Sequence, residues 1–180
     1  YEIRLSLVGS EMCIRDRVKR VPTRFFAVMQ DEAIQPPGST VKQFSVMLQN
    51  RVGALSALLG LLDMHGIFCL GFSMHDCHEA TIARLVVSDP ERTSEIFLEK
   101  GICYTDSDVL VAALRHGPAD LKRCLDVLYS AEMNVNFVYP LLPRVAGVSL
   151  IALHVDDMNF GRTVLNSSGI KVLFQQDLSR

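Results

Sequence analysis

The amino-acid sequence predicts an α+β fold that consists of two consecutive βαββαβ units. Each unit is expected to form a four-stranded antiparallel sheet with both helices on one face. Short runs alternate apolar and polar residues, and longer runs repeat apolar residues every three to four positions, which indicates strands and helices respectively. The order strand, helix, strand, strand, helix, strand occurs twice, at an offset of 66 residues that becomes 68 after the second hairpin.

The first unit, which we place at residues 42–106, begins with a strand at Phe44–Leu48. A polar turn at residues 49–53 leads from this strand into a helix. Gly66 is expected to end the helix, because glycine readily adopts the left-handed conformation found after helix ends. The apolar stripe of the helix consists of Leu55, Leu58, Leu59 and Leu62.

The second half of this unit contains two strands and a polar hairpin between residues 67 and 87. Asp89 is expected to cap a helix that has Pro90 at its first position, since both residue types are favoured there. Gly101 is expected to end that helix. A last strand at residues 102–104 then closes the unit.

The second unit, which we place at residues 107–180, repeats this order. A strand at residues 109–114 leads through a turn at Arg115–Pro118 into a helix. The predicted apolar stripe of this helix consists of Leu121, Leu125 and Leu128. At the helix ends, the offsets align Gly66-Ile67 with Glu132-Met133 and Gly101-Ile102 with Gly169-Ile170.

A βαββαβ order gives the ferredoxin-like arrangement, in which one face of the sheet carries no helix. In a unit this small, the uncovered face and the exposed edge strand invite pairing. We therefore expect two units side by side and assembly of the chain into a homo-oligomer.

Residues 1–17 are expected to be foreign to the natural protein, because the string Leu5–Arg17 resembles a translated sequencing adapter. The alternative is a genuine strand or targeting segment, but its apolar run is too short and too mixed for a signal peptide. Residues 18–41 form a lead segment, in which Phe25 and Phe26 are expected to pack on the first unit.

Composition and charge exclude several classes of protein. The chain has 18 basic and 20 acidic side chains and a net charge of −2, which argues against a nucleic-acid partner. No apolar run reaches the roughly 20 residues that a membrane span needs. The five cysteines lack CxxC spacing, and unpaired thiols fit a reducing compartment. We therefore expect a cytoplasmic protein without a membrane anchor.

The repeated unit resembles the ACT family over residues 42–177. The resemblance rests on the segment Asn50–Leu55 after the first strand, on the two glycine-isoleucine pairs at 66–67 and 101–102, and on Val86–Glu91. Family members usually have proline where Val52 stands. The second copy departs further, with His116-Gly117-Pro118-Ala119 in place of the usual proline-glycine pair.

The resemblance implies a non-catalytic regulatory protein. ACT units typically bind an amino acid or a related effector at the interface between paired units and pass its occupancy to a metabolic enzyme. In some relatives the enzyme is a separate chain, as with the regulatory subunit of acetolactate synthase. The alternative is a structural module for protein–protein interaction that binds no ligand, because fold alone does not settle function.

The candidate ligand site is the junction between the first strand and the first helix. The first N–H groups of a helix lack internal partners and carry positive charge, so a carboxylate can bind there. Gly53 lets a ligand approach the backbone, and the amide of Asn50 can accept from an ammonium and donate to a carboxylate. The candidate ligand-binding residues are Asn50, Arg51, Val52, Gly53, Ala54, Leu55, Phe68, Gly117, Pro118, Ala119 and Asn134. Either Asn50 of one unit pairs with Asn134 of another in a composite site, or both are ordinary loop asparagines.

The sequence offers little for catalysis. The cluster Met74–His78 holds two histidines and a cysteine, which suit zinc, but the spacing matches no standard site and a polar hairpin tip is favoured. Asp89 with Glu91 and Asp156 with Asp157 are expected to cap helices rather than to form catalytic pairs. No nucleophile elbow, phosphate loop or dinucleotide motif is present. We expect no catalytic residue, no metal and no cofactor, and a small metal-dependent enzyme remains the third alternative.

Overall fold

The computed structural model describes residues 38–77, 80–142, 145 and 147–178. The segment assigned to an adapter, residues 1–17, lies outside the described residues. So do residues 18–37 of the lead segment, with Phe25 and Phe26.

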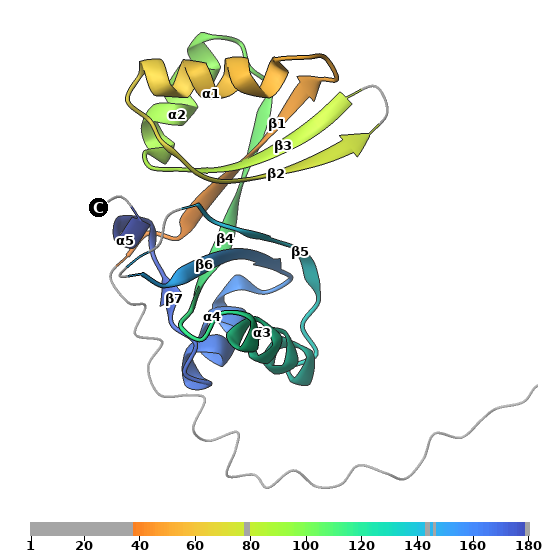
Figure 1. Cartoon of the computed structure of the whole chain (residues 1–180), viewed down its shortest axis with the longest axis vertical. Helices are drawn as coiled ribbons and strands as arrows, with labels where there is room; N and C mark the ends of the chain where they lie inside the picture. Colours follow the sequence, from red (N-terminus) through yellow and green to blue (C-terminus); the bar gives the residue numbers. More distant parts are fainter. Residues whose placement is uncertain (1–37, 78–79, 143–144, 146, 179–180) are drawn as a thin grey trace, which may run out of the picture. The chain divides into compact units, whose positions relative to one another are not determined.

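The described part of the chain contains the two predicted βαββαβ units in order (Figure 1). The elements of the first are β1 (Val41–Gln49), α1 (Ala54–Met64), β2 (Cys69–Cys77), β3 (Ala80–Val87), α2 (Pro90–Glu99) and β4 (Tyr104–Leu114). Those of the second are the end of β4, α3 (Pro118–Ser130), β5 (Val135–Pro140), β6 (Ser149–Val155), α4 (Met158–Ser167), β7 (Val172–Leu173) and α5 (Gln175–Leu178). The predicted α+β class with antiparallel sheets is confirmed.

The strand β4 is shared by both units. The strand order is β2-β3-β1-β4-β6-β5, with β7 also paired to β4, and all pairings are antiparallel. The sequence predicted two separate strands, one ending at residue 104 and one starting at residue 109. This prediction is wrong, because residues 104–109 pair with β1 and form one continuous strand with residues 110–114. The polar residues in this stretch have partners: Lys42 Nζ lies 3.2 Å from Asp106 and 3.3 Å from Asp108.

The helices α1 to α4 end in one common motif. The residue after each C-cap has a left-handed backbone, with φ of 70° at Gly66, 66° at Gly101, 56° at Glu132 and 79° at Gly169. The N–H group of the next residue then bonds back to a helix carbonyl at 2.8 to 3.0 Å in each case, which is the Schellman motif. The shared geometry confirms the predicted alignment of the helix ends.

The apolar stripe of α3 differs from the prediction. The helix buries Cys124 and Leu128, whereas Leu125 is 37% exposed. A free cysteine acts as a small hydrophobe, and the spacing of four residues from Cys124 to Leu128 keeps one face toward the sheet. Burial raises the pKa of the Cys124 thiol to about 11, so the thiol stays protonated in the core.

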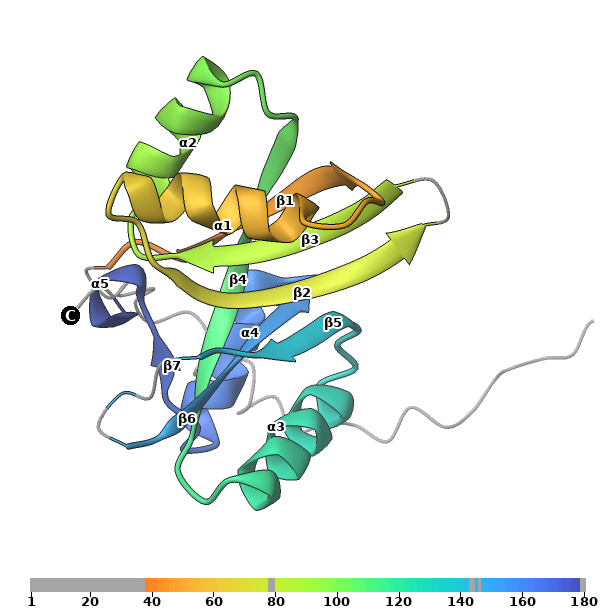
Figure 2. The ribbon, with the colours of Figure 1, turned by 45° about the horizontal axis from the view of Figure 1, so that its top comes forward.

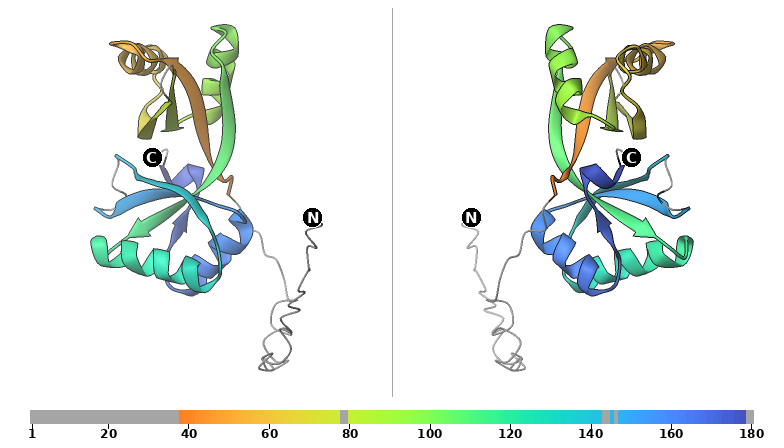
Figure 3. Two further views of the ribbon diagram at one scale, coloured as in Figure 1. Left: turned by 90° about the vertical axis from the view of Figure 1, so that its right-hand side faces the viewer. Right: turned by 90° about the vertical axis from the view of Figure 1, so that its left-hand side faces the viewer.

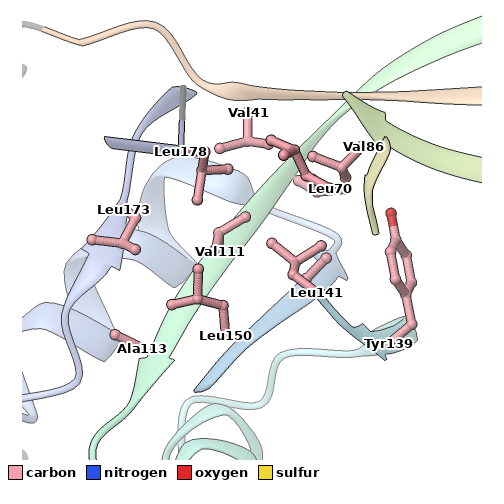
Figure 4. Close-up of a cluster of buried hydrophobic side chains, with 12 residues drawn as sticks. Val41, Leu70, Val86, Val111, Ala113, Tyr139, Leu141, Leu150, Leu173 and Leu178 are labelled. Carbon is pink, nitrogen blue, oxygen red and sulfur yellow. The ribbon is translucent and has the colours of Figure 1, made fainter. Parts of the chain in front are cut away.

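Three hydrophobic clusters hold the described part together. One lies between the first sheet, formed by β1 to β4, and the helices α1 and α2. A second lies between the second sheet, formed by β4 to β7, and the helices α3 and α4. The third lies between the two sheet faces that α1 to α4 leave uncovered, and α5 contributes Leu178 to it (Figure 4). Its buried members are Val41, Leu70, Val86, Val109, Val111, Ala113, Tyr139, Leu141, Leu150, Ala152, Leu173 and Leu178. We call this third cluster the shared core.

The edge strands β2 and β5 close the sheets around the shared core (Figure 2). Gly71 forms a bridge with Leu141, and the N–H group of Leu142 donates to the carbonyl of Leu70 at 2.7 Å. Inside, the hydroxyl of Tyr139 donates to Oε1 of Gln43 at 2.7 Å. Figure 3 shows β1 and β4 side by side, with β4 continuing into the second sheet. Within one chain, these two sheet faces therefore cover each other.

Candidate functional site

The junction between β1 and α1 forms a tight turn with an uncapped helix start. The N–H group of Arg51 donates to the carbonyl of Gln49 at 2.8 Å, and that of Ala54 donates to the carbonyl of Arg51 at 3.2 Å. Gly53 is the N-cap residue, with φ of 84°, a conformation that glycine adopts without strain. No side chain caps α1, whereas Asp89 caps α2 and Asp157 caps α4, as predicted.

A cavity of about 300 Å³ lies at this junction. It is lined by most of the predicted segment, including Asn50, Arg51 and Gly53, together with Met74 and Thr81 from the β2–β3 hairpin. Ala54 and Leu55 also line it, but Val52, which is completely exposed, does not. The structure thus brings five of the six residues from the Asn50–Leu55 segment around one cavity.

The chemistry available in this cavity suits a small zwitterion. The first turn of α1 contains no acidic side chain, so the positive charge of the helix start is not neutralised from within the helix. The guanidinium of Arg51 is exposed and adds a cation that can pair with a carboxylate. The amide of Asn50, also exposed, supplies both a donor and an acceptor.

The corresponding junction between β4 and α3 is filled by the protein itself. The carboxylate of Asp120, in the first turn of α3, accepts from the backbone N–H group of His116 at 2.8 Å. The ring nitrogen Nδ1 of His116 lies 3.2 Å from the same carboxylate. The hydrogen bond from the His116 backbone is the main cause that lowers the pKa of Asp120. A buried carboxylate of the chain therefore lies in the first turn of α3 and accepts from the N–H group just before the N-cap residue, and we call this junction filled.

The predicted residues Gly117, Pro118 and Ala119 surround this filled junction. Gly117 is the N-cap residue, with φ of 62°, and Pro118 and Ala119 are exposed in the first turn. We missed Asp120 as a residue that shapes the site. Its spacing of three residues from the N-cap Gly117 is that of a capping box, in which an acidic side chain reaches back to backbone N–H groups, and this signal was available.

Phe68 and Asn134 lie apart from the junction cavity. Phe68 is 64% exposed beyond the far end of α1, where its N–H group donates to Oγ of Ser88 at 3.0 Å. The amide of Asn134 donates to Asn136 at 3.0 Å, and Asn134 lines a different cavity of about 530 Å³. This cavity shares no residue with the one that Asn50 lines, so one chain does not bring Asn50 and Asn134 together.

Most of the cluster Met74–His78, which we expected at a polar hairpin tip, lies in a strand. Met74, His75 and Asp76 belong to β2, not to a hairpin tip. His75 pairs with Ile82 and Asp76 with Thr81, so the two side chains point to opposite faces of the sheet. The side chain of Cys77 and residue His78 lie outside the described residues. Within those that are described, no group of three His, Cys, Asp or Glu side chains could hold a metal ion.

Comparison with known proteins gives a family and a fold. The family model described as an ACT domain pair matches residues 39–180. The protein BT0572 from Bacteroides thetaiotaomicron has a similar structure, with a TM-score of 0.72 at 20% identity over 79% of this chain and 98% of that chain. No match was found among the curated proteins.

Two further solved structures are similar in fold. The ligand-free regulatory subunit of aspartate kinase from Thermus thermophilus has a TM-score of 0.52 at 10% identity, over 74% of this chain and 93% of that chain. A structure of aspartokinase alpha and beta subunits has a TM-score of 0.50 at 15% identity, over 72% of this chain and 93% of that chain. Among the helices of the described residues, none combines the length and the apolar character needed to cross a membrane.

Proposed function

The chain belongs to the family of ACT domain pairs, and from this premise we propose that it is a non-catalytic regulatory protein that binds a small amino acid at the β1–α1 junction. The bound amino acid controls a metabolic enzyme carried on a separate chain. The observation that supports this most strongly is the contrast between the two junctions. The first is open and lacks an acid, whereas the second is filled by Asp120.

The proposed binding mode uses the groups at the first junction. The carboxylate of the amino acid binds the free N–H groups at the start of α1 and the guanidinium of Arg51, while the ammonium donates to the oxygen of Asn50. Each charge-assisted hydrogen bond contributes roughly 1.5 to 3 kcal/mol, so three or four of them support micromolar affinity. At the second junction, a ligand carboxylate would meet the negative charge of Asp120, and we propose that this junction does not bind.

The regulatory role follows the pattern of similar folds. One of the similar structures is the regulatory subunit of an aspartate kinase, which is a chain of this fold that serves an enzyme. We propose the same relation here, with an enzyme of amino-acid metabolism as the partner in trans.

We also propose that the chain forms a homo-oligomer. Beyond Gly71, β2 is an edge strand, and its outward side pairs with no other strand of the described chain. Phe72 and Met74 are 39% and 47% exposed along this edge, an apolar surface that a second copy can cover.

A thermal-shift panel of the twenty amino acids tests the proposal. A ligand selective for the folded chain raises its stability by about 2.7 kcal/mol at 100 times its Kd, which corresponds to roughly 5 to 10 °C for a chain of this size. Asn50→Ala is expected to remove most of this shift. Asn134→Ala, at the exposed asparagine outside the cavity, is the control and should leave the shift unchanged.

Gly53→Val provides a second test with a matched control. Valine at this position blocks the approach to the helix start, but it also strains the backbone. Gly66→Val introduces the same strain at another left-handed glycine, where added atoms likewise meet nothing within 4 Å. Loss of binding in Gly53→Val alone supports the site. Equal binding in both variants, or a flat panel for the folded protein, would favour the interaction-module alternative.

A further inference from the structure

A second, larger cavity adjoins the β1–α1 junction on the other side of β1. Its volume is about 620 Å³, and it shares Leu48, Gln49, Arg51 and Ala54 with the first cavity. The first cavity extends toward β3, whereas this one extends toward the residues that precede β4. Because β1 lies between β3 and β4 in the sheet, the two cavities flank the end of β1 and meet at Arg51.

Most of the side chains that line this second cavity are apolar, and Gln49 and Arg51 add polar groups to it. Met47, Leu58, Leu61 and Ile102 contribute aliphatic or thioether surface, and among the described residues of the lining only Arg51 is charged. Met47 is 65% exposed, although it lies in a strand whose neighbours are well packed. Both cavities fall in the range of about 300 to 1,000 Å³ that is typical of small-molecule sites.

We propose that this cavity takes the side chain of the amino acid whose head group binds at the junction, and that the effector has a large apolar side chain, either branched aliphatic or aromatic. The inference rests on the proposed function and specifies its ligand class. A basic side chain would meet the guanidinium of Arg51 as a like charge, and an acidic one would have to share that guanidinium with the ligand's own carboxylate. An apolar side chain covers the exposed lining and gains from leaving water.

Calorimetric titration of the full chain with L-leucine, L-phenylalanine, L-alanine, L-lysine and L-aspartate measures this selectivity. Each methylene lost from an apolar pocket weakens binding by roughly tenfold or more, so leucine or phenylalanine is expected to bind at least about 100-fold tighter than alanine. Lysine and aspartate are expected to bind no better than alanine.

Filling the cavity supplies the matched variants. Ala57 is exposed on α1 and lines the cavity, so Ala57→Leu occupies part of the space without breaking the helix. This variant is expected to bind leucine or phenylalanine at least about tenfold more weakly and to bind alanine with unchanged affinity. Gly60→Leu places the same side chain on the same helix outside both cavities, where an added Cβ meets nothing within 4 Å, and should not change binding.

Cys103 reports occupancy directly, because it lines the cavity and is exposed. Burial raises the pKa of Cys69 and of Cys124, which slows their reaction. Alkylation by N-ethylmaleimide, corrected with a Cys103→Ser variant for all other thiols, is expected to slow at least about tenfold at saturating leucine or phenylalanine.

The outcomes separate this inference from the proposed function. Binding with a preference for small or charged amino acids, or tight binding of leucine without protection of Cys103, would overturn the assignment of the cavity and leave the regulatory function intact. If none of the twenty amino acids binds the folded chain, both proposals fail.

Discussion

Replacing Gly71 by alanine tests the closure of the two sheets around the shared core. A Cβ atom at Gly71 would lie 2.2 Å from Cδ2 of Leu141 and 3.3 Å from its Cα. Leu141 is 7% exposed and packs in the shared core, so its side chain has little room to move away. Overpacking of this kind costs about 1 to 3 kcal/mol, and we expect Gly71→Ala to lower the free energy of unfolding by that amount.

A double-mutant cycle identifies the cause. Leu141→Ala alone removes a buried leucine and is expected to cost about 2 to 5 kcal/mol. In the double variant the new methyl group enters the vacated space, so the combined loss should be smaller than the sum by about 1 to 3 kcal/mol. Urea unfolding measures all three variants, with Gly60→Ala as the control, which should stabilise the exposed helix by about 0.5 to 1 kcal/mol. A neutral Gly71→Ala, or additive losses, would refute the described contact.

Three further predictions concern other parts of the chain. Glu132 has a left-handed φ of 56°, which glycine adopts at lower cost than other residues. Glu132→Gly should therefore raise the free energy of unfolding by about 0.5 to 1 kcal/mol in urea unfolding, and a loss of stability would contradict the Schellman motif at the end of α3. Tyr139→Phe removes the buried donor to Gln43 and should cost about 1 to 3 kcal/mol, whereas no change would mean that Gln43 finds another donor. The hydrogen bond from the His116 N–H group lowers the pKa of Asp120 below its ordinary value of 3.8. The carboxylate therefore contributes its full stability when the pH is above 3.8, and this contribution is lost as the pH falls through the lowered pKa of the folded state. Asp120→Asn should therefore flatten the fall of the unfolding free energy below about pH 4, and an unchanged pH profile would contradict it.

The local structure was predictable where single residues carry strong conformational preferences. Asp89 and Pro90 start α2 as predicted, and Gly66 and Gly101 end their helices in the left-handed conformation. The offset between the copies even identified Glu132, which adopts this conformation without being glycine. These outcomes depend on a few neighbouring residues, which is why sequence reasoning was sufficient.

The long-range arrangement was less accessible. Residues 105–108 are polar and suggested a break, but they form part of β4 because Lys42 and β1 pair with them across the sheet. The shared core needs residues from both units, and nothing local to Gly71 indicates that Leu141 packs on it. The large cavity beside Arg51 also combines residues from three elements, so its lining was not visible in the sequence.

The candidate site lies between these two cases. The segment Asn50–Leu55 does surround a cavity, as helix-end physics suggested, although Val52 points away from it. The filled state of the second junction depends on the side chain of Asp120, which folds back to the N–H group of His116. A capping-box spacing was present, but the folded backbone decides which N–H group the carboxylate reaches, here that of His116.

The number of amino-acid molecules bound by each chain tests the central claim most directly. Isothermal titration with the amino acid selected by the thermal-shift panel measures this number. One open junction and one filled by Asp120 predict one molecule per chain, lost in Gly53→Val and retained in Gly66→Val. Two molecules per chain, or no saturable binding by the folded protein, would contradict the account.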